Sequence, residues 1–389
     1  MSWPEDTAKL ERVRALMADE DLDALVVRSP DNVLYLSNYW GMKGYDAVVF
    51  PREGRPTLIC LDPQLEEAQR MSWTDDILTF GGYDAADPRP PFARTLDLAA
   101  GVVEERGFKR IGLELSQGTQ ASDRMVGEPT TFSLPWFDGF GHTGAEVVDG
   151  ATVISRARAI KTEQEIERMK LANELAALAY DEVRSKVRAG MTEAEVGAMY
   201  EGFVHATGTG FEGKVDLARA FTLVWAGPGI ATFTATSNRP VLEDEPTLLE
   251  IWVVVDGYWS DLTKNVCPGK LRPEYDELLD GLLGVYNAAI DHLRPGASLA
   301  ELDVMIREGI AALGYEGQPS HPIAHGVGAR AHEFPYAHQA ADVKLEEGMV
   351  MAIEPGIYWE GGGGLRVEDN YLITADGSEK LSRAPDDFR

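Results

Sequence analysis

The sequence predicts a two-domain protein, with an α/β domain in residues 1–155 and an α+β domain in residues 156–389. A chain of 389 residues is long for a single hydrophobic core, which favours two domains. Helix and strand signals alternate along the first part, as in a small α/β domain. In the second part, helices are interleaved with antiparallel strand pairs, which indicates the α+β class.

The first domain shows its expected elements as short apolar segments. Leu10, Val13, Leu16 and Met17 recur at helical spacing, so a helix is expected near the N-terminus. Apolar runs bounded by turn residues are expected to be strands, at 24–27, 46–50, 57–61 and 110–115. The turn-rich segment 51–56 would join the second of these strands to the third.

Helix starts in the second domain are marked by capping boxes. In a capping box, a Ser or Thr side chain and a Glu three residues later satisfy each other's free backbone N–H groups. The three candidate pairs are Thr162/Glu165, Thr192/Glu195 and Ser298/Glu301. The helix after Ser298 is expected to end at Gly314, because glycine suits the left-handed position that follows a helix.

Composition excludes several classes of function. The chain has 36 basic and 64 acidic residues and a net charge of −28, and such a surface repels nucleic acid and anionic membranes. No apolar run is long enough for a membrane helix, and the N-terminus lacks the pattern of a signal peptide. Two distant cysteines, Cys60 and Cys267, argue against a disulfide framework and fit the reducing cytoplasm.

A segment in the second domain predicts a β-hairpin that carries two carboxylates on one face. Asp256-Gly257 between two runs of strand-forming residues is a strong hairpin signal. With the turn there, Trp252 pairs with Asp261, and Glu250 becomes a diagonal neighbour of Asp261, with Cα atoms about 7–8 Å apart. On a buried face, two such carboxylates need a cation between them or a raised pKa. The alternative is a solvated outer face, which needs neither.

A second group of charged residues lies near the C-terminus. Glu354 ends an apolar run, where burying a glutamate is costly unless it is paired. After the glycines 361–364, a new strand is expected to carry Arg366 and Glu368 on one face, because they are two residues apart. The alternative is a routine Arg–Glu pair on a surface hairpin, which suits Glu368 better than Glu354.

Histidines concentrate between these two groups. His321, His325 and His332 are three of the seven histidines in the chain, and a Gly-Val-Gly motif lies among them. A lone histidine is more often structural, but three of them near paired carboxylates favour a reaction centre. Four carboxylates and one imidazole would carry about four negative charges, which two divalent cations balance; such ligands suit Mn²⁺, Co²⁺, Fe²⁺ or Zn²⁺.

These segments resemble the pita-bread metallohydrolases of peptidase family M24, which include prolidase, Xaa-Pro aminopeptidase, methionine aminopeptidase and creatinase. Near the start of this chain, the segment LDALVVRSPDNVLYLSNYWG resembles the N-terminal domain of the creatinase/prolidase branch. Further along, RAIKTEQEIERMKLAN resembles the entry into the catalytic domain of that branch. Four further segments of this chain resemble the site motifs of that branch and occur in the same order: GYWSDLTKNV, HPIAHGVGARAHEFP, EEGMVMAIEPGIY and GLRVEDNYLIT. The resemblance covers nearly the whole chain, and it implies a creatinase-type N-terminal domain followed by a pita-bread catalytic domain.

The resemblance also implies roles for individual residues. Two divalent metal ions would be held by Glu250, Asp261, His325, Glu354 and Glu368. Catalysis would be carried by Glu354 as general base, together with His325 and His332. Substrate would be contacted by His321 and His332, with Arg366 behind the ligands and Phe233 in the pocket wall.

Two positions depart from the pattern of the peptidases. Eleven residues before Asp261 the peptidases have aspartate, whereas this chain has Glu250; ectoine hydrolase resembles this chain in having glutamate there. Seventeen residues before Glu250, the peptidases and creatinase have histidine, whereas this chain has Phe233. A phenyl ring donates no proton or hydrogen bond to a substrate, which weakens the case for ordinary Xaa-Pro cleavage.

Several hypotheses about function follow. The leading one is a metal-dependent hydrolase of an amide or other C–N bond in a short peptide or small molecule, with Xaa-Pro peptidases as the favoured subclass. Phe233 and Glu250 motivate the second, a creatinase- or ectoine-hydrolase-like enzyme that acts on a small osmolyte or guanidino compound with little or no metal. A lyase acting on dimethylsulfoniopropionate ranks below these. A non-catalytic scaffold ranks last, because every ligand position keeps an ionisable residue.

Proteins of this type are commonly homodimers in which the N-terminal domain of one subunit closes the site of the other. The aromatic residues Tyr35, Tyr39 and Trp40 would then contribute to such a lid. The alternative is that these aromatics pack within their own domain, and the sequence leaves both open.

Overall fold

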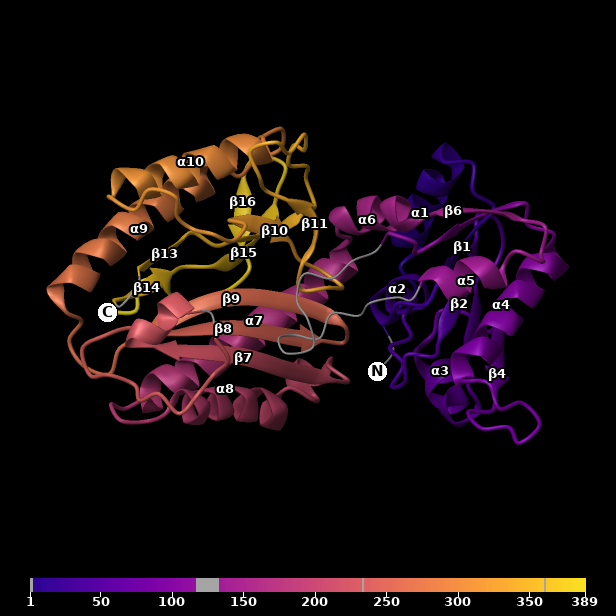
Figure 1. Cartoon of the computed structure of the whole chain (residues 1–389), viewed down its shortest axis with the longest axis horizontal. Helices are drawn as coiled ribbons and strands as arrows, with labels where there is room; N and C mark the ends of the chain where they lie inside the picture. Colours follow the sequence, from indigo (N-terminus) through magenta and orange to yellow (C-terminus); the bar gives the residue numbers. More distant parts are fainter. Residues whose placement is uncertain (1–2, 117–132, 233, 360–361) are drawn as a thin grey trace. The chain divides into compact units, whose positions relative to one another are not determined.

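The structure is a computed structural model that describes residues 3–116, 133–232, 234–359 and 362–389 (Figure 1). The chain divides between Arg158 and Ala159 into two compact units, here called the N-terminal unit and the C-terminal unit. The predicted boundary after residue 155 lies inside the helix α6 (Ala151–Ala159). Within the described part of the chain, no helix is both long enough and apolar enough to cross a membrane.

The N-terminal unit is built on a six-stranded mixed sheet with the strand order β4-β3-β2-β1-β5-β6. Its strands are β1 (Ala24–Val27), β2 (Ala47–Pro51), β3 (Thr57–Leu61), β4 (Ile77–Phe80), β5 (Arg110–Leu113) and β6 (Glu146–Asp149). Its other helices are α1 (Thr7–Asp19), α2 (Pro30–Ser37), α3 (Leu65–Met71), α4 (Pro91–Arg106), α5 (Ser133–Gly139) and the short η1 (Asp62–Gln64). The predicted first helix and four strands are confirmed, although β5 ends two residues earlier than expected.

Helices cover both faces of this sheet, because successive strand residues point to opposite sides. Leu25 of β1 packs in a core with α1 and α2, whereas its neighbour Val26 packs in a second core with α4 and α5. This is the predicted α/β arrangement. Tyr35 and Tyr39 belong to the first core, so these two aromatics pack within their own domain.

The C-terminal unit contains a three-stranded sheet, a five-stranded sheet and a two-stranded ribbon, all antiparallel. The three-stranded sheet has the order β7 (Ala218–Ala226), β8 (Thr247–Val255), β9 (Tyr258–Val266). The five-stranded sheet has the order β11 (Glu333–Tyr336), β10 (Ala324–Gly326), β12 (Val350–Ile353), β15 (Asp369–Ile373), β16 (Ser378–Lys380). The ribbon pairs β13 (Gly356–Trp359) with β14 (Gly363–Arg366).

Long helices flank these sheets, and they are α7 (Glu163–Lys186), α8 (Glu193–Thr207), α9 (Pro273–His292) and α10 (Leu299–Ala312). Two short 3-10 helices, η2 (Phe211–Gly213) and η3 (Gly227–Thr232), lie before and after β7. Figure 1 shows α7 and α8 against the three-stranded sheet and α9 and α10 beside the ribbon and the five-stranded sheet. Apolar residues of α9, α10, β10, β12 and β15 form one large core. This interleaving confirms the predicted α+β class.

Of the three predicted capping boxes, two are complete in the structure. α7 and α8 begin with complete capping boxes at Thr162 and Thr192, as predicted. At α10 the Ser298 side chain accepts a hydrogen bond from the backbone N–H of Glu301, but the reciprocal bond is not formed, so a complete box there is a wrong prediction. Gly314 follows α10 with φ 96°, the left-handed conformation expected after the helix.

The hairpin of β8 and β9 has the predicted register. Asp256 has φ 45° and Gly257 has φ 84°, and positive φ at both central residues is what a two-residue type I′ turn requires. Trp252 pairs with Asp261, and Glu250 lies opposite Thr263. Glu250 and Asp261 are therefore diagonal neighbours on one face of a buried hairpin, and the solvated-face alternative is wrong.

Candidate active site

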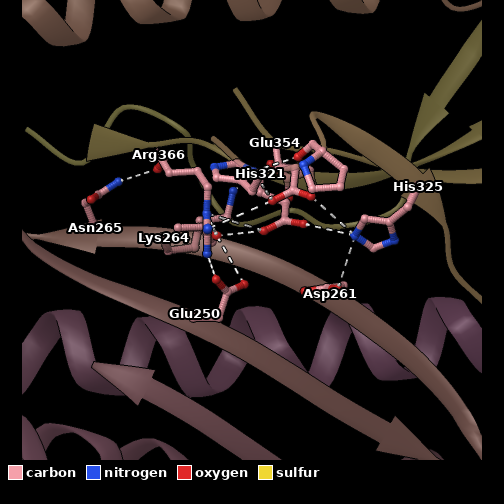
Figure 2. Close-up of polar contacts among 12 residues, drawn as sticks. Glu250, Asp261, Lys264, Asn265, His321, His325, Glu354 and Arg366 are labelled. Carbon is pink, nitrogen blue, oxygen red and sulfur yellow. Dashed lines mark hydrogen bonds and ion pairs between the residues drawn. The ribbon is translucent and has the colours of Figure 1, made fainter. Parts of the chain in front are cut away.

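Charged side chains from separate segments of the C-terminal unit meet at one place (Figure 2). The β8–β9 hairpin supplies Glu250 and Asp261, and the end of β12 supplies Glu354. Arg366 and Glu368 come from the junction of β14 and β15, and histidines come from β10 and its flanking loops. These five charged side chains are all buried, so their charges have to be balanced by one another or by a bound ion.

His325 lies on β10 with its Nε2 atom facing three carboxylates. Nε2 is 3.5 Å from Glu354 Oε1, 3.6 Å from Asp261 Oδ2 and 4.0 Å from Glu368 Oε1. Its other ring nitrogen, Nδ1, is 3.0 Å from the backbone carbonyl oxygen of Gly326. Because a carbonyl oxygen only accepts, Nδ1 carries the proton and Nε2 presents a lone pair to the carboxylates. This is the tautomer that a metal ligand needs.

His332 lies between β10 and β11 and stands beside His325, with ring centroids 4.5 Å apart. Its Nε2 is 3.5 Å from Asp261 Oδ2. The edge of the ring meets Trp252, whose centroid is 6.3 Å away. Since Trp252 pairs with Asp261 across the hairpin, the same strand register places both neighbours of His332.

Glu354 directly follows β12. Its backbone N–H donates a hydrogen bond to the carbonyl of Ile323 at 2.9 Å, which fixes the position of the residue. Burial raises the pKa of Glu354 well above its ordinary value, and the negative charges of Glu368 and Asp261 raise this pKa further. Carboxylates this close repel one another when all are ionised. A divalent cation among them would relieve the repulsion.

His321 is linked to the site through Tyr358. Its Nδ1 lies 2.6 Å from the carbonyl oxygen of Pro322, so Nδ1 donates there, and Nε2 accepts from the Tyr358 hydroxyl at 2.9 Å. Burial lowers the pKa of His321 to about 4, so the ring is neutral at neutral pH. Glu354 Oε2 lies 3.3 Å from Nδ1. His321 therefore contacts both the Tyr358 hydroxyl and the carboxylate of Glu354.

Arg366 ends β14 and reaches back to the hairpin (Figure 2). Its Nη2 forms an ion pair with Glu250 Oε2, and its Nε donates to Thr263 Oγ1 at 2.7 Å. Nη1 donates to the Tyr358 hydroxyl at 3.4 Å. Burial lowers the pKa of Arg366 to about 10, so the guanidinium remains charged at neutral pH. Glu250 thus has a cationic partner within the protein.

Glu368 lies between β14 and β15, so the prediction of one strand carrying both Arg366 and Glu368 is wrong. The chain changes sheets here, because β14 pairs with β13 whereas β15 pairs with β12. Both side chains are nevertheless buried, with Arg366 Nε 3.9 Å from Glu368 Oε2, and this excludes a surface pair.

Three overlapping groups of side chains bring ligand atoms to within 4.8 Å of one another. They are Asp261/His325/His332, His325/Glu354/Glu368 and Glu250/Asp261/Glu368. Carboxylate oxygen and imidazole nitrogen are donors that Mn²⁺, Co²⁺, Fe²⁺ and Zn²⁺ accept. Together with the orientation of His325 Nε2 and the crowding around Glu354, this donor set fits a divalent metal.

The structure brings together every predicted site residue that it describes, and Phe233 lies outside the described residues. Sequence reasoning missed Thr263, Tyr358 and Asn370. Asn370 accepts from the backbone N–H of Asp261 at 3.0 Å and donates to its carbonyl at 2.8 Å, which fixes that strand. Thr263 follows Asp261 by two residues and so shares its face, a signal that could have found it. The sequence carries no comparable signal for Tyr358 or Asn370.

Comparisons with known proteins cover both units. Residues 167–375, more than half of the chain, match the model of metallopeptidase family M24, and residues 9–160 match the creatinase/prolidase N-terminal domain. An Xaa-Pro dipeptidase of Lactobacillus helveticus is 26% identical over 396 residues, covering 98% of this chain and 98% of the relative.

Solved structures show the same architecture. The prolidase of Pyrococcus horikoshii OT3 has a TM-score of 0.79 at 25% identity, covering 97% of this chain and 99% of that one. An Xaa-Pro dipeptidase of Bacillus anthracis has a TM-score of 0.81 at 23% identity, covering 98% of each chain, which shows the fold alone. The chain belongs to metallopeptidase family M24, as a hydrolase with a creatinase/prolidase N-terminal domain and a pita-bread catalytic domain.

Proposed function

We propose that this chain is a divalent-metal-dependent hydrolase of a C–N bond that cleaves the peptide bond before proline in short Xaa-Pro peptides. The observation that carries the proposal is His325, whose Nε2 lies 3.5–4.0 Å from one oxygen of each of three carboxylates. One nitrogen and several carboxylate oxygens around a point are suited to hold a catalytic metal. The Xaa-Pro dipeptidase and the prolidase named above support the choice of bond, since each is similar to this chain over both domains.

The proposed metal site holds two divalent ions, of Mn²⁺, Co²⁺, Fe²⁺ or Zn²⁺. Its ligands would be Glu250, Asp261, His325, Glu354 and Glu368. Bound ions of this kind supply a nucleophile at neutral pH, because coordination lowers the pKa of water to about 7.

Glu354 is the proposed general base, which accepts a proton from the attacking water and passes it to the leaving amine. Its position supports this role, because Glu354 Oε1 lies 3.5 Å from His325 Nε2, within the proposed ligand set. His332 is the histidine proposed to contact the substrate beside His325. His321 would act through Tyr358, because its Nε2 accepts the tyrosine hydrogen bond.

A second candidate is a creatinase- or ectoine-hydrolase-like enzyme that acts on a small osmolyte or guanidino compound. The ion pair between Glu250 and Arg366 favours it, because it gives Glu250 a partner other than a metal. Phe233, where the peptidases have histidine, favours it from the sequence. A homodimer in the cytoplasm stays a prediction for either candidate.

A substrate panel tests the proposal against this alternative. With Mn²⁺ or Co²⁺ present, we expect kcat/KM to be higher for Xaa-Pro dipeptides than for matched Xaa-Ala dipeptides, because the pocket has to accept the proline ring. Release of the C-terminal amino acid measures this directly. Turnover of creatine or a cyclic osmolyte without turnover of any dipeptide would instead establish the second candidate.

A further inference from the structure

The hydroxyl of Thr263 lies between two charged side chains of the site. Oγ1 is 2.7 Å from Arg366 Nε and 2.6 Å from Glu368 Oε2, and the threonine is fully buried on β9. Glu250 Oε1 is further away, at 3.5 Å. One neutral side chain thus contacts both the guanidinium and two of the carboxylates in the site.

The directions of these hydrogen bonds follow from the chemistry of the donors. A guanidinium N–H only donates, so Oγ1 accepts from Arg366 Nε. The single hydroxyl proton of Thr263 then remains for a carboxylate, and the 2.6 Å contact with Glu368 Oε2 takes it in preference to the 3.5 Å contact with Glu250. Hydrogen bonds to charged groups of this length are among the stronger ones.

The backbone brings Thr263 and Glu368 to this distance. The two residues form an isolated antiparallel bridge, in which the N–H of Glu368 donates to the carbonyl of Thr263 at 3.4 Å. Asn265, two residues further along β9, donates to the carbonyl of Arg366 at 2.8 Å. β9 therefore anchors the segment 366–368, and the Thr263 hydroxyl orients the two charged side chains that the segment carries.

We propose that Thr263 is a positioning residue that presents Oε1 of Glu368 to the divalent cation and holds Arg366 away from that carboxylate. The hydroxyl donates its hydrogen bond to Oε2 of Glu368. The other carboxylate oxygen, Oε1, faces His325 Nε2 at 4.0 Å. Arg366 Nε lies only 3.9 Å from Glu368 Oε2, so loss of the hydroxyl between them would let Arg366 replace the cation as the partner of Glu368. The inference rests on the proposed metal dependence of the enzyme.

The test is isothermal titration calorimetry, in which Mn²⁺ is titrated into metal-free full-length protein and its dissociation constant is measured. Thr263→Val removes the hydroxyl at nearly constant volume, and it is expected to weaken Mn²⁺ binding by about 10–100-fold, the usual effect of losing a group that orients a metal ligand. Thr263→Ser restores the hydroxyl and is expected to bind like the wild type. Ser260→Ala is the matched control, because Ser260 is equally buried on the same strand, at odd spacing from Thr263, and donates instead to the carbonyl of Val253.

The visible absorption of the Co²⁺-loaded proteins gives a second readout that a purely structural role would not change. We expect the spectrum to differ from wild type in Thr263→Val and to be unchanged in Thr263→Ser and Ser260→Ala. Wild-type Mn²⁺ affinity in Thr263→Val overturns the inference while leaving the proposed function intact. Weakened binding in a folded Thr263→Ser variant also overturns it, even if Thr263→Val fails to fold. Absence of Mn²⁺ and Co²⁺ binding by the wild type overturns the inference and the proposed metal dependence together.

Discussion

Replacing Glu354 with glutamine is expected to lower kcat/KM for Xaa-Pro dipeptides by about 10²–10⁴-fold, the usual contribution of a positioned general base. The amide keeps the size of the side chain but accepts no proton at neutral pH. Glu354 also lies 3.5 Å from His325 Nε2, so the change additionally removes one negative charge from the proposed ligand set. Steady-state assays of proline release measure the loss.

The control for this prediction is Glu379→Gln in the same unit. Glu379 lies on β16 and pairs with Lys170 at the surface, where ion pairs contribute little to stability. We expect Glu379→Gln to retain the wild-type kcat/KM and the wild-type melting temperature. A Glu354→Gln variant as active as the control would rule out Glu354 as the base.

Replacing His325 with alanine is expected to weaken divalent-cation binding by at least about 100-fold. Losing a group that only orients a ligand costs about 10–100-fold, and His325 is itself a proposed ligand. It also belongs to two of the three candidate metal groups, so one substitution removes a ligand from both and leaves the group with Glu354 and Glu368 without a nitrogen donor. Equilibrium dialysis followed by metal analysis measures the bound fraction.

His338→Ala provides the matched control for the histidine substitution. His338 is exposed in the same unit, and its Nδ1 accepts from the backbone N–H of Ala340 at 3.2 Å. We expect this variant to bind as many ions per chain as the wild type. Equal binding by His325→Ala and His338→Ala would contradict the assignment of His325.

The β8–β9 hairpin shows why part of the site could be predicted from the sequence. Asp256-Gly257 specifies the turn locally, and a two-residue turn then sets the pairing of every residue in both strands. The diagonal arrangement of Glu250 and Asp261 follows from that register alone. The complete capping boxes of α7 and α8 are local in the same sense, since each depends on residues three positions apart.

Contacts between distant segments could not be predicted in the same way. Glu368 reaches the site because the chain passes from the ribbon into the five-stranded sheet just there, which alternation along one strand does not reveal. Tyr358 meets His321 across 37 positions of the sequence. The ion pair of Arg366 with Glu250 likewise depends on how the ribbon packs on the hairpin.

Glu250 is the residue at which the two candidate functions diverge. In the described structure its carboxylate contacts Arg366, yet it also lies within 4.8 Å of ligand atoms from Asp261 and Glu368. A cation that shares Glu250 has to compete with a guanidinium that remains charged at neutral pH. The proposed metallopeptidase requires that the cation displaces Arg366 from Glu250, whereas the non-peptidase alternative requires that Arg366 keeps its ion pair with Glu250.

The most direct measurement is the release of proline from an Xaa-Pro dipeptide by the purified full-length protein, before and after removal of metal with a chelator. We predict that activity disappears as the metal content falls and returns when Mn²⁺ or Co²⁺ is added back. Unchanged proline release by protein whose metal content has been brought to zero would contradict the account.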